Sequence, residues 1–281
     1  MSAEKFMLFT FSLICSLALS ACRMDSTESL YGSKDSAIIG GTEVPNESPL
    51  SRSVALLFNR MTTEVCTASI LNNQFVLTAA HCVVGANSKD LYLIFDTTLS
   101  EKSATRRVVA AKTTNYYNPK ATRKTNTGDL AVVRFAGGAP HGYTAAKFLT
   151  NPTLLSDKAE VTVVGYGVNN DETRTGAGSL RTTTVQILDS NYSQTELTLD
   201  QSRHSGVCHG DSGGPVYAIV NGKLYLWGVV SRSVNPDNCS EAAIVTDALV
   251  YLPWIKDTIL SMAAQKMEIP PDEGPLFSEG D

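Results

Sequence analysis

One serine in the sequence stands in a setting that suits covalent chemistry. Ser212 lies in V-C-H-G-D-S-G-G-P-V, residues 207–216, among three glycines. Glycine permits positive φ angles and a close approach of the backbone to a ligand, so this stretch fits a tight turn that presents one hydroxyl and bare amide N–H groups. An acyl-transfer site needs such a turn. A glycine-rich turn with an ordinary surface serine gives the same pattern, so partners elsewhere in the chain must decide between the two.

A serine is activated by a base within reach and by a third group that orients the base. His81 ends an apolar run, L-T-A-A-H-C, and adjoins Cys82, which predicts a fixed position for its side chain. His141 and His204 lie in loop-like or polar segments without such an anchor. His81 is therefore the candidate base.

Asp129 is the candidate orienting group, because it heads the apolar run L-A-V-V-R-F. A buried carboxylate is costly unless it is hydrogen-bonded, and a histidine partner would meet that cost; the alternative is a plain turn residue at a strand start. Chain order excludes two hydrolase folds. No histidine follows Ser212, as an α/β-hydrolase requires, and the aspartates ahead of His81 lie in a polar linker, which argues against the subtilisin order. The order His81, Asp129, Ser212 remains.

The segments that must position these residues are short and β-branched, and turn residues separate them. Such spacing predicts an all-β barrel or sandwich. Asn221-Gly222 between two apolar runs predicts a hairpin. A loop-like segment at 141–157 divides the strands into two lobes, at about 38–145 and 150–250. The predicted strands are 53–58, 67–80, 91–95, 106–111, 130–135, 161–167, 182–188 and 215–231.

One helix is predicted at the C-terminal side, over 252–266. Pro253 fits its first turn, and apolar residues recur at helical spacing on one face. The acidic segment 267–281 contains prolines and is expected to be disordered. The face consists of Ile255, Ile259, Met262 and Ala263.

Composition excludes several classes of protein. The chain has 281 residues, of which 43% are hydrophobic, enough for one large domain or two small lobes. The net charge of -5 and the absence of a basic run argue against a nucleic-acid partner. No H-E-x-x-H or C-x-x-C spacing is present, so neither a metal nor another cofactor is expected.

The N-terminal residues predict export. An apolar run at 6–21 follows Lys5 and is typical of a secretory signal, which we place at 1–21. Its end, L-S-A-C, resembles the bacterial lipobox and predicts lipid attachment at Cys22; the alternative is a plain signal with an unmodified cysteine. Residues 22–37 would then form a polar, lipid-anchored linker. Four cysteines remain in the exported part, an even number that predicts two disulfides in one of three pairings.

From Ile38 to about Met262, the chain resembles the trypsin/chymotrypsin-like serine proteases. Four motifs carry the resemblance in the right order: I-I-G-G at 38–41, T-A-A-H-C at 78–82, G-D-L-A at 128–131 and G-D-S-G-G-P at 210–215. The resemblance implies an all-β protease domain over 38–266, built from two antiparallel six-stranded β-barrels and a C-terminal helix.

The family's roles carry over residue by residue. The resemblance makes Ser212 the nucleophile, His81 the general base and then acid, and Asp129 the group that holds the histidine tautomer. The N–H groups of Gly210 and Ser212 would form the oxyanion hole. It also pairs Cys66 with Cys82, and Cys208 with Cys239.

The resemblance also implies a specificity. At the floor of the pocket for the P1 side chain, where an aspartate would select arginine or lysine, the chain has Gly206. A cationic P1 residue would lose its water without gaining a countercharge, so small or medium apolar P1 residues are expected. The residues expected to contact substrate are Gly206, Val207, Ser231, Ser233 and Ala243.

Three features depart from the family. Arg232 stands where an aromatic residue usually follows the serine at 231, and the loop from Ser231 to Cys239 is longer than usual. His209 is expected at the rim of the pocket, where it either contacts substrate or has no role. These departures concern the subsites and leave the triad unchanged.

Activation is implied by the I-I-G-G motif. Cleavage after Ala37 would free the amine of Ile38, which would insert and pair with Asp211. Ala37 replaces the usual arginine or lysine, so the activating protease should prefer small residues, and self-activation is compatible with the apolar pocket. No cysteine between Arg23 and Ala37 could tether the propeptide. The cut would therefore release the catalytic domain from the lipid on Cys22.

The expectation is an exported serine endopeptidase made as a zymogen. It would face the periplasm or the cell surface, anchored to the membrane through its lipid until activation. Its partners would be protein or peptide substrates and an activating protease, with no nucleic acid. Two alternatives use the same fold: a binding protein that never turns over, and an esterase.

Overall fold

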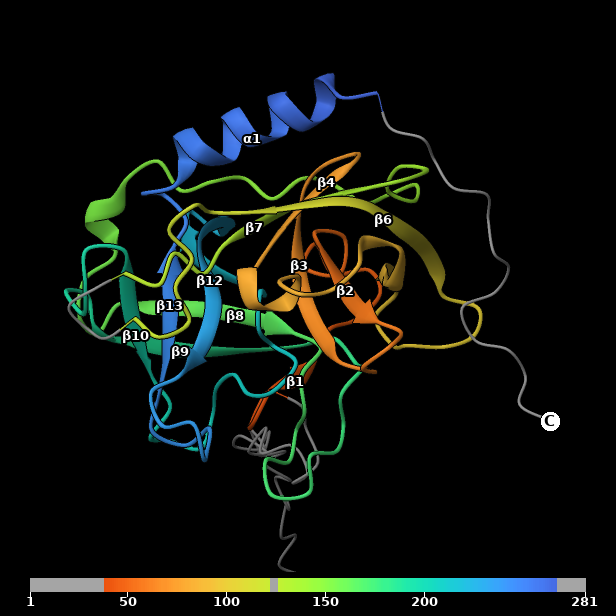
Figure 1. The fold of residues 1–281 in the computed structure, drawn as a ribbon. Coiled ribbons are helices and arrows are strands. Elements are labelled where there is room, and N and C mark those ends of the chain that lie inside the picture. The colour runs from red at the N-terminus through yellow and green to blue at the C-terminus, as the bar shows by residue number, and fades with distance from the viewer. Residues whose placement is uncertain (1–37, 122–125, 267–281) are drawn as a thin grey trace, which may run out of the picture. The chain divides into compact units, whose positions relative to one another are not determined.

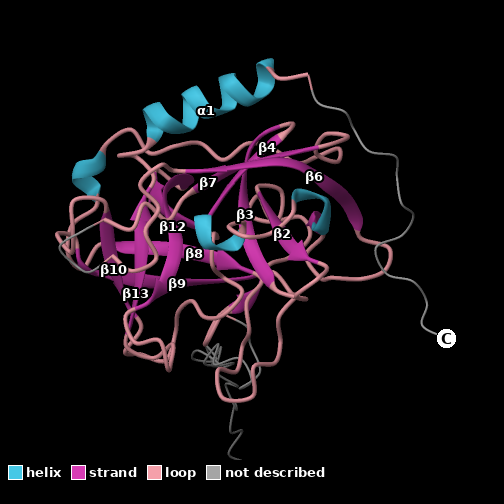
Figure 2. Ribbon diagram, viewed as in Figure 1, coloured by secondary structure: helices cyan, strands magenta, loops and turns pink. Residues whose placement is uncertain are grey.

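The computed structural model describes residues 38–121 and 126–266, drawn in colour in Figure 1. The expected signal at 1–21, the linker at 22–37 with Cys22 and Ala37, and the tail at 267–281 lie outside the described residues. Within the described ranges, no helix is long and apolar enough to cross a membrane. Strands form most of the regular structure (Figure 2).

Six antiparallel strands close the first barrel, in the order β2-β3-β4-β7-β6-β5. Two 3₁₀ turns, η1 (Ala80–Cys82) and η2 (Ser88–Asp90), lie between β4 and β5. Each strand pairs with neighbours close in sequence, except that β2 also pairs with β5 and β4 with β7, which closes the ring. The strands are β2 (Val54–Asn59), β3 (Val65–Asn72), β4 (Phe75–Thr78), β5 (Leu91–Phe95), β6 (Ala104–Thr113) and β7 (Ala131–Phe135).

The second barrel follows the order β9-β10-β13-β12-β11-β8, and pairing of β8 with β9 closes it. The short β1 (Thr42–Glu43) adds to β9 as a seventh strand, although it precedes the first barrel in sequence. A 3₁₀ turn, η3 (Pro152–Leu154), precedes β8. The strands are β8 (Glu160–Gly165), β9 (Arg181–Asp189), β10 (Glu196–Asp200), β11 (Pro215–Val220), β12 (Lys223–Ser233) and β13 (Ala242–Asp247). The predicted fold class, two six-stranded antiparallel barrels, is confirmed.

The burial of strand β7 explains why its sequence is mostly apolar. Side chains alternate between the two faces of a strand, and both faces of β7 are covered. Ala131 and Val133 point into the first barrel. Val132 and the preceding Leu130 join a second cluster, together with side chains of the other barrel such as Tyr166. The start of β7 therefore lies next to the junction of the two barrels.

The predicted hairpin and helix are both present. Asn221 and Gly222 have φ angles of 50° and 70° and connect β11 to β12, as a two-residue hairpin turn requires. Helix α1 (Leu252–Ala264) begins with Pro253 in its first turn. Its buried residues are Ile255, Thr258 and Met262, whereas Ala263 is exposed and is not part of the buried face.

Candidate active site

His81 lies in the 3₁₀ turn η1, directly after β4. The neighbouring Cys82 forms a disulfide with Cys66 on β3, so the turn is tied to an adjacent strand. This is one of the two pairings that the resemblance implied. The side chain of His81 is 35% exposed, which leaves part of the imidazole open to a substrate.

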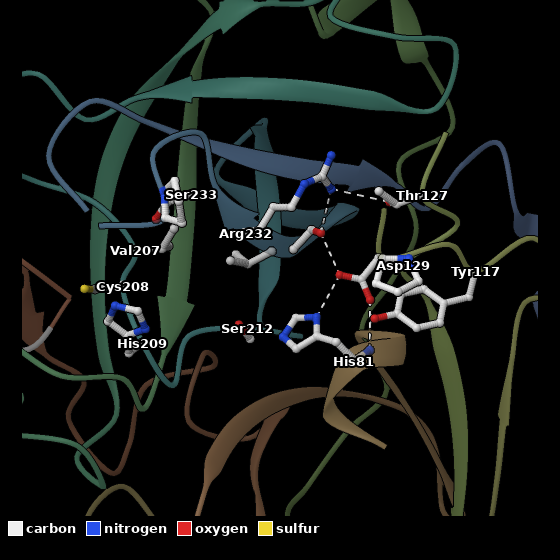
Figure 3. A pocket seen from close by; sticks show the side chains of 14 residues that line it. His81, Tyr117, Thr127, Asp129, Val207, Cys208, His209, Ser212, Arg232 and Ser233 are labelled. Atoms are coloured by element: carbon white, nitrogen blue, oxygen red, sulfur yellow. Dashed lines mark hydrogen bonds and ion pairs between the residues drawn. The ribbon is translucent and has the colours of Figure 1, made fainter. Parts of the chain in front are cut away.

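Asp129 precedes β7 and is buried. Its Oδ1 accepts a hydrogen bond from the backbone N–H of His81 at 3.0 Å, and its Oδ2 lies 2.8 Å from Nδ1 of the same histidine. The hydroxyl of Ser231 donates to Oδ2 at 2.6 Å. Figure 3 shows the carboxylate between these partners. The carboxylate is therefore well satisfied, and it fixes the position of the imidazole.

The His81–Asp129 pair shifts both titrations. Burial alone would lower the pKa of His81, but the hydrogen bond and charge of Asp129 outweigh it, so this pKa is raised. Burial would raise the pKa of Asp129, but hydrogen bonds from His81 and Ser231 hold it below its ordinary value. The pair thus favours an ionised aspartate that stabilises a protonated imidazole.

Ser212 lies in the loop between β10 and β11, and Cys208 of the same loop forms the second predicted disulfide with Cys239. The loop is fastened to the first barrel: the N–H of Thr67 donates to the carbonyl of Ser212 at 2.8 Å, and the hydroxyl of Thr67 donates to the carbonyl of Gly210 at 2.9 Å. Both bonds join β3 to the loop. The two bonds thus fix the position of the Ser212 loop relative to the first barrel, next to which His81 and Asp129 lie.

The structure brings His81, Asp129 and Ser212 to one pocket of about 370 Å³, although they come from three separate segments (Figure 3). His81 and Ser212 also line a second, adjoining pocket, together with Gly210. A peptide that crosses from one pocket to the other would pass over the serine. The three residues singled out from chain order therefore share one cleft.

Gly210 fits its place only as glycine. Its φ angle is 97°, and a Cβ there would lie 2.8 Å from the Cα of Gly167. Among the described residues, the amide N–H groups of Gly210 and Ser212 have no acceptor within the protein. Two free donors beside a serine hydroxyl can bind an oxyanion.

Asp211, the residue before Ser212, is fully buried. Its carboxylate accepts hydrogen bonds from the N–H groups of Gly167 and Cys208, each at 2.8 Å. Burial outweighs these bonds and raises the pKa of Asp211 to about 7. Ile38 is also fully buried, in the core of the second barrel, and Ile39 pairs with Gly206 in an antiparallel bridge.

Three of the five predicted substrate contacts line the pocket that holds all three of His81, Asp129 and Ser212, namely Val207, Ser231 and Ser233. Gly206 and Ala243 are buried and do not line it. Arg232 and His209, which depart from the family pattern, do line it. Sequence reasoning did not anticipate the Tyr117 side chain there, since only its position beyond β6 brings it to the site.

Gln201 explains why Gly206 is covered. Its buried side chain donates to the carbonyls of Val207 and Cys239, and its Oε1 accepts from the N–H of Val207 at 2.6 Å. A Cβ at position 206 would lie 2.3 Å from that Oε1. The Gln201 side chain thus fills the space beside Gly206, below the part of the pocket wall that Val207 forms. No sequence signal identified it, because its partners are backbone atoms, one set in its own loop and one 38 residues further along the chain.

Two groups of side chains among the described residues are close enough to share a metal ion. One contains Asp171 and His209 with the Cys208–Cys239 disulfide, and the other contains His81 with the Cys66–Cys82 disulfide. A metal prefers the thiolate form of cysteine, and disulfide sulfurs do not supply it. Neither group offers three free ligand side chains.

Two linked barrels with this cleft define a serine-hydrolase fold, and the sequence comparisons agree. The trypsin family profile matches residues 38–255. The chain is 29% identical over 212 residues to trypsin Blo t 3 of Blomia tropicalis, covering 69% of this chain and 77% of that protein. It is 26% identical over 242 residues to chymotrypsin-like elastase family member 1 of Macaca fascicularis, with coverage of 80% and 90%. Trypsin-1 of Astacus astacus is 26% identical over 237 residues, with coverage of 78% and 98%.

The chain therefore belongs to the trypsin family. It is a serine endopeptidase of the trypsin/chymotrypsin-like class, and its substrates are proteins or peptides.

Proposed function

We propose that Ser212, His81 and Asp129 form the catalytic triad of this endopeptidase. The observation that carries the proposal is the pair of hydrogen bonds from His81 to the buried Asp129, at the pocket that Ser212 lines. With Nδ1 bonded to the carboxylate, the other ring nitrogen is the one available to a substrate or nucleophile.

The reaction proceeds through an acyl-enzyme. Ser212 Oγ bonds to the carbonyl carbon of the scissile peptide while its proton moves to Nε2 of His81. The N–H groups of Gly210 and Ser212 bind the resulting oxyanion, each contributing about 3 kcal/mol. His81 then gives the proton to the leaving amine as the C–N bond breaks. Water then attacks the ester carbonyl carbon as His81 takes its proton, and His81 gives that proton to Ser212 Oγ as the C–O ester bond breaks and the carboxylic acid product leaves.

The pocket supports cleavage after small or medium apolar residues. Val207 and Val230 line it, and Gln201 fills the space under Gly206. The acidic residue that lines the pocket, Asp129, is already bonded to His81. A cationic P1 side chain would be desolvated there without a countercharge.

The enzyme is activated by cleavage after Ala37. The pKa of about 7 at Asp211 marks a buried carboxylate whose charge is poorly compensated in the uncut chain. A new ammonium at Ile38 would supply the missing cation, because Ile38 packs against the same barrel core as Val207, next to Cys208. Pairing would hold the turn that carries Gly210 in place.

Export and membrane attachment complete the proposal. The signal at 1–21 directs secretion, lipid on Cys22 anchors the zymogen, and activation releases the catalytic domain. The four cysteines of the protease domain are joined in two disulfides, which suits an oxidising compartment. Cell fractionation with N-terminal sequencing and an activity assay of each fraction tests this. Full activity in a membrane-bound species that begins at Cys22 would contradict it.

Turnover measurements distinguish the proposed endopeptidase from its alternatives. The enzyme cut after Ala37 should hydrolyse peptide bonds that have residues on both sides, and Ser212→Ala should abolish this turnover. An esterase would hydrolyse ester substrates but leave the matching peptides intact. A binding protein would retain tight peptide binding with no turnover, and Ser212→Ala would change nothing.

A further inference from the structure

Arg232 on β12 forms an ion pair behind the active site. Its Nη1 lies 2.8 Å from Oε1 of Glu196, and its Nη2 donates to Oε2 at 3.1 Å. Glu196 belongs to β10, on the far side of β13 from β12. The Glu196 side chain is 0% exposed and the Arg232 side chain 32% exposed. A two-point contact with a fully buried carboxylate restricts the guanidinium to one orientation.

The same guanidinium reaches the catalytic pair through Ser231. Nη1 of Arg232 donates to the hydroxyl of Ser231 at 3.1 Å, and that hydroxyl lies 2.6 Å from Oδ2 of Asp129. A guanidinium has donors only, whereas a serine hydroxyl has one proton to give. Because Ser231 accepts from Arg232, its proton is directed to Asp129. Figure 3 shows the bonds that run from Arg232 to His81.

Thr127 makes this arrangement continuous with the segment that carries Asp129. Its hydroxyl donates to Oε1 of Glu196 at 2.5 Å, and it lies 3.4 Å from Nη1 of Arg232. Glu196 therefore bonds both to Arg232 and to Thr127, which precedes Asp129 by two residues. The chain of contacts runs from Glu196 through Arg232 and Ser231 to Asp129 without a gap.

We propose that Arg232, held by Glu196, is a positioning residue for the His81–Asp129 pair. It orients the Ser231 hydroxyl toward Asp129 and holds a fixed cation on the other side of that hydroxyl from the carboxylate. This inference rests on the proposed triad. It gives Arg232, found where the family usually has an aromatic side chain, a role in the chemical step in addition to its place on the pocket wall.

The charges around His81 predict the direction in which its pKa changes when Arg232 is lost. After burial and Asp129, the charge of Arg232 is the next influence on the pKa of His81, and it lowers that pKa. Glu64 acts in the opposite sense. The other titratable side chains at the pocket are Tyr117 and His209. Loss of the arginine should therefore make the imidazole harder to deprotonate.

The test measures the pH dependence of kcat/KM together with kcat. In Arg232→Gln, we expect the acid-limb midpoint to rise by roughly half a pH unit and kcat to fall by about tenfold. Arg232→Lys keeps the charge but not the two-point contact, so its midpoint should stay near that of the wild type while kcat falls. Arg60→Gln removes an exposed pair with Asp90 and should change neither quantity.

The double variant Glu196→Gln/Arg232→Gln is a control for misfolding, because Arg232→Gln alone leaves the buried carboxylate of Glu196 without its cation. We expect kcat to fall in the double variant as well. NMR titration of His81 in Ser212→Ala protein, with and without Arg232→Gln, reports the same shift without catalysis. If the wild-type enzyme is inactive, the proposed function is refuted, but the His81 titration can still be measured and still tests the role of Arg232. If the arginine variants change only KM, and the His81 titration stays fixed, Arg232 is a substrate contact and the proposal is wrong.

Discussion

The side chain of Gln201 occupies the space that a side chain at position 206 would need, with its Oε1 only 2.3 Å from where a Cβ would lie. All three of its polar contacts are to backbone atoms of Val207 and Cys239. The space beside Gly206, which the resemblance places at the floor of the P1 pocket, is thus filled by an amide whose hydrogen bonds are satisfied. A glycine at 206 therefore does not mean a deep, open pocket.

This closure predicts the cleavage preference. In a peptide library, the cut enzyme should cleave after alanine, valine, leucine or methionine at least about 100-fold better than after arginine or lysine, since a desolvated cation costs several kcal/mol. Gly206→Asp should not create trypsin-like cleavage, because the new side chain would collide with Gln201. A profile led by basic P1 residues would contradict the prediction and would require a countercharge elsewhere in the pocket.

The role of Asp129 in catalysis can be tested by a single substitution. Asp129→Asn keeps the shape but presents an amide to His81, so the ring would adopt the other tautomer and lose its role as a base. We expect kcat to fall roughly 10⁴-fold with little change in KM. Asp157→Asn, an exposed carboxylate that caps the N–H of Ser190, is the matched control. Equal activity of the two variants would remove Asp129 from the mechanism.

Much of this site could be predicted from the sequence, because its residues lie in local motifs. The hairpin at Asn221-Gly222 and the strand Leu91–Phe95 were also predicted, from turn chemistry and from a short apolar run. Strands β10 and β13 were not, although most of their residues are buried. Their short runs, E-L-T-L-D and A-A-I-V-T-D, contain acidic residues and alanine, which are depleted in strands, so β propensity does not mark them.

Contacts between distant segments could not be predicted. Glu196 reads as an ordinary charged residue in sequence, and only the pairing of β10 with β13 carries it behind Arg232. Likewise, β1 joins the second barrel because Ile38 and Ile39 are drawn into it. Such placements depend on strand order, which a single sequence does not specify.

Asp211 predicts a difference in stability between the uncut and the cut protein. Its pKa in the folded chain, about 7, lies above its ordinary value of 3.8. The folded state therefore holds this proton more tightly than the unfolded chain does. The stability that this proton contributes is fully present below about pH 3.8 and is lost as the pH rises through about 7.

We expect the free energy of unfolding of the uncut Ser212→Ala protein to fall by roughly 2–3 kcal/mol between pH 5 and pH 8. After cleavage at residue 37, the Ile38 ammonium should keep Asp211 ionised and remove most of this fall. Urea unfolding of both forms checks it, with the cut form prepared by brief trypsin treatment of an Ala37→Arg variant and verified by N-terminal sequencing. An identical pH dependence in both forms would argue against the pairing.

The central claim, that Ser212 is a nucleophile activated by His81, is tested most directly by covalent labelling. The cut enzyme should be treated with a peptidyl phosphonate that carries valine at P1, digested, and mapped by mass spectrometry. We predict a single adduct on Ser212, no adduct in Ser212→Ala, and labelling slowed by at least about 10³-fold in His81→Ala. Labelling of the Ser212→Ala protein at an equal rate, or an adduct on a different residue of the wild type, would contradict the account.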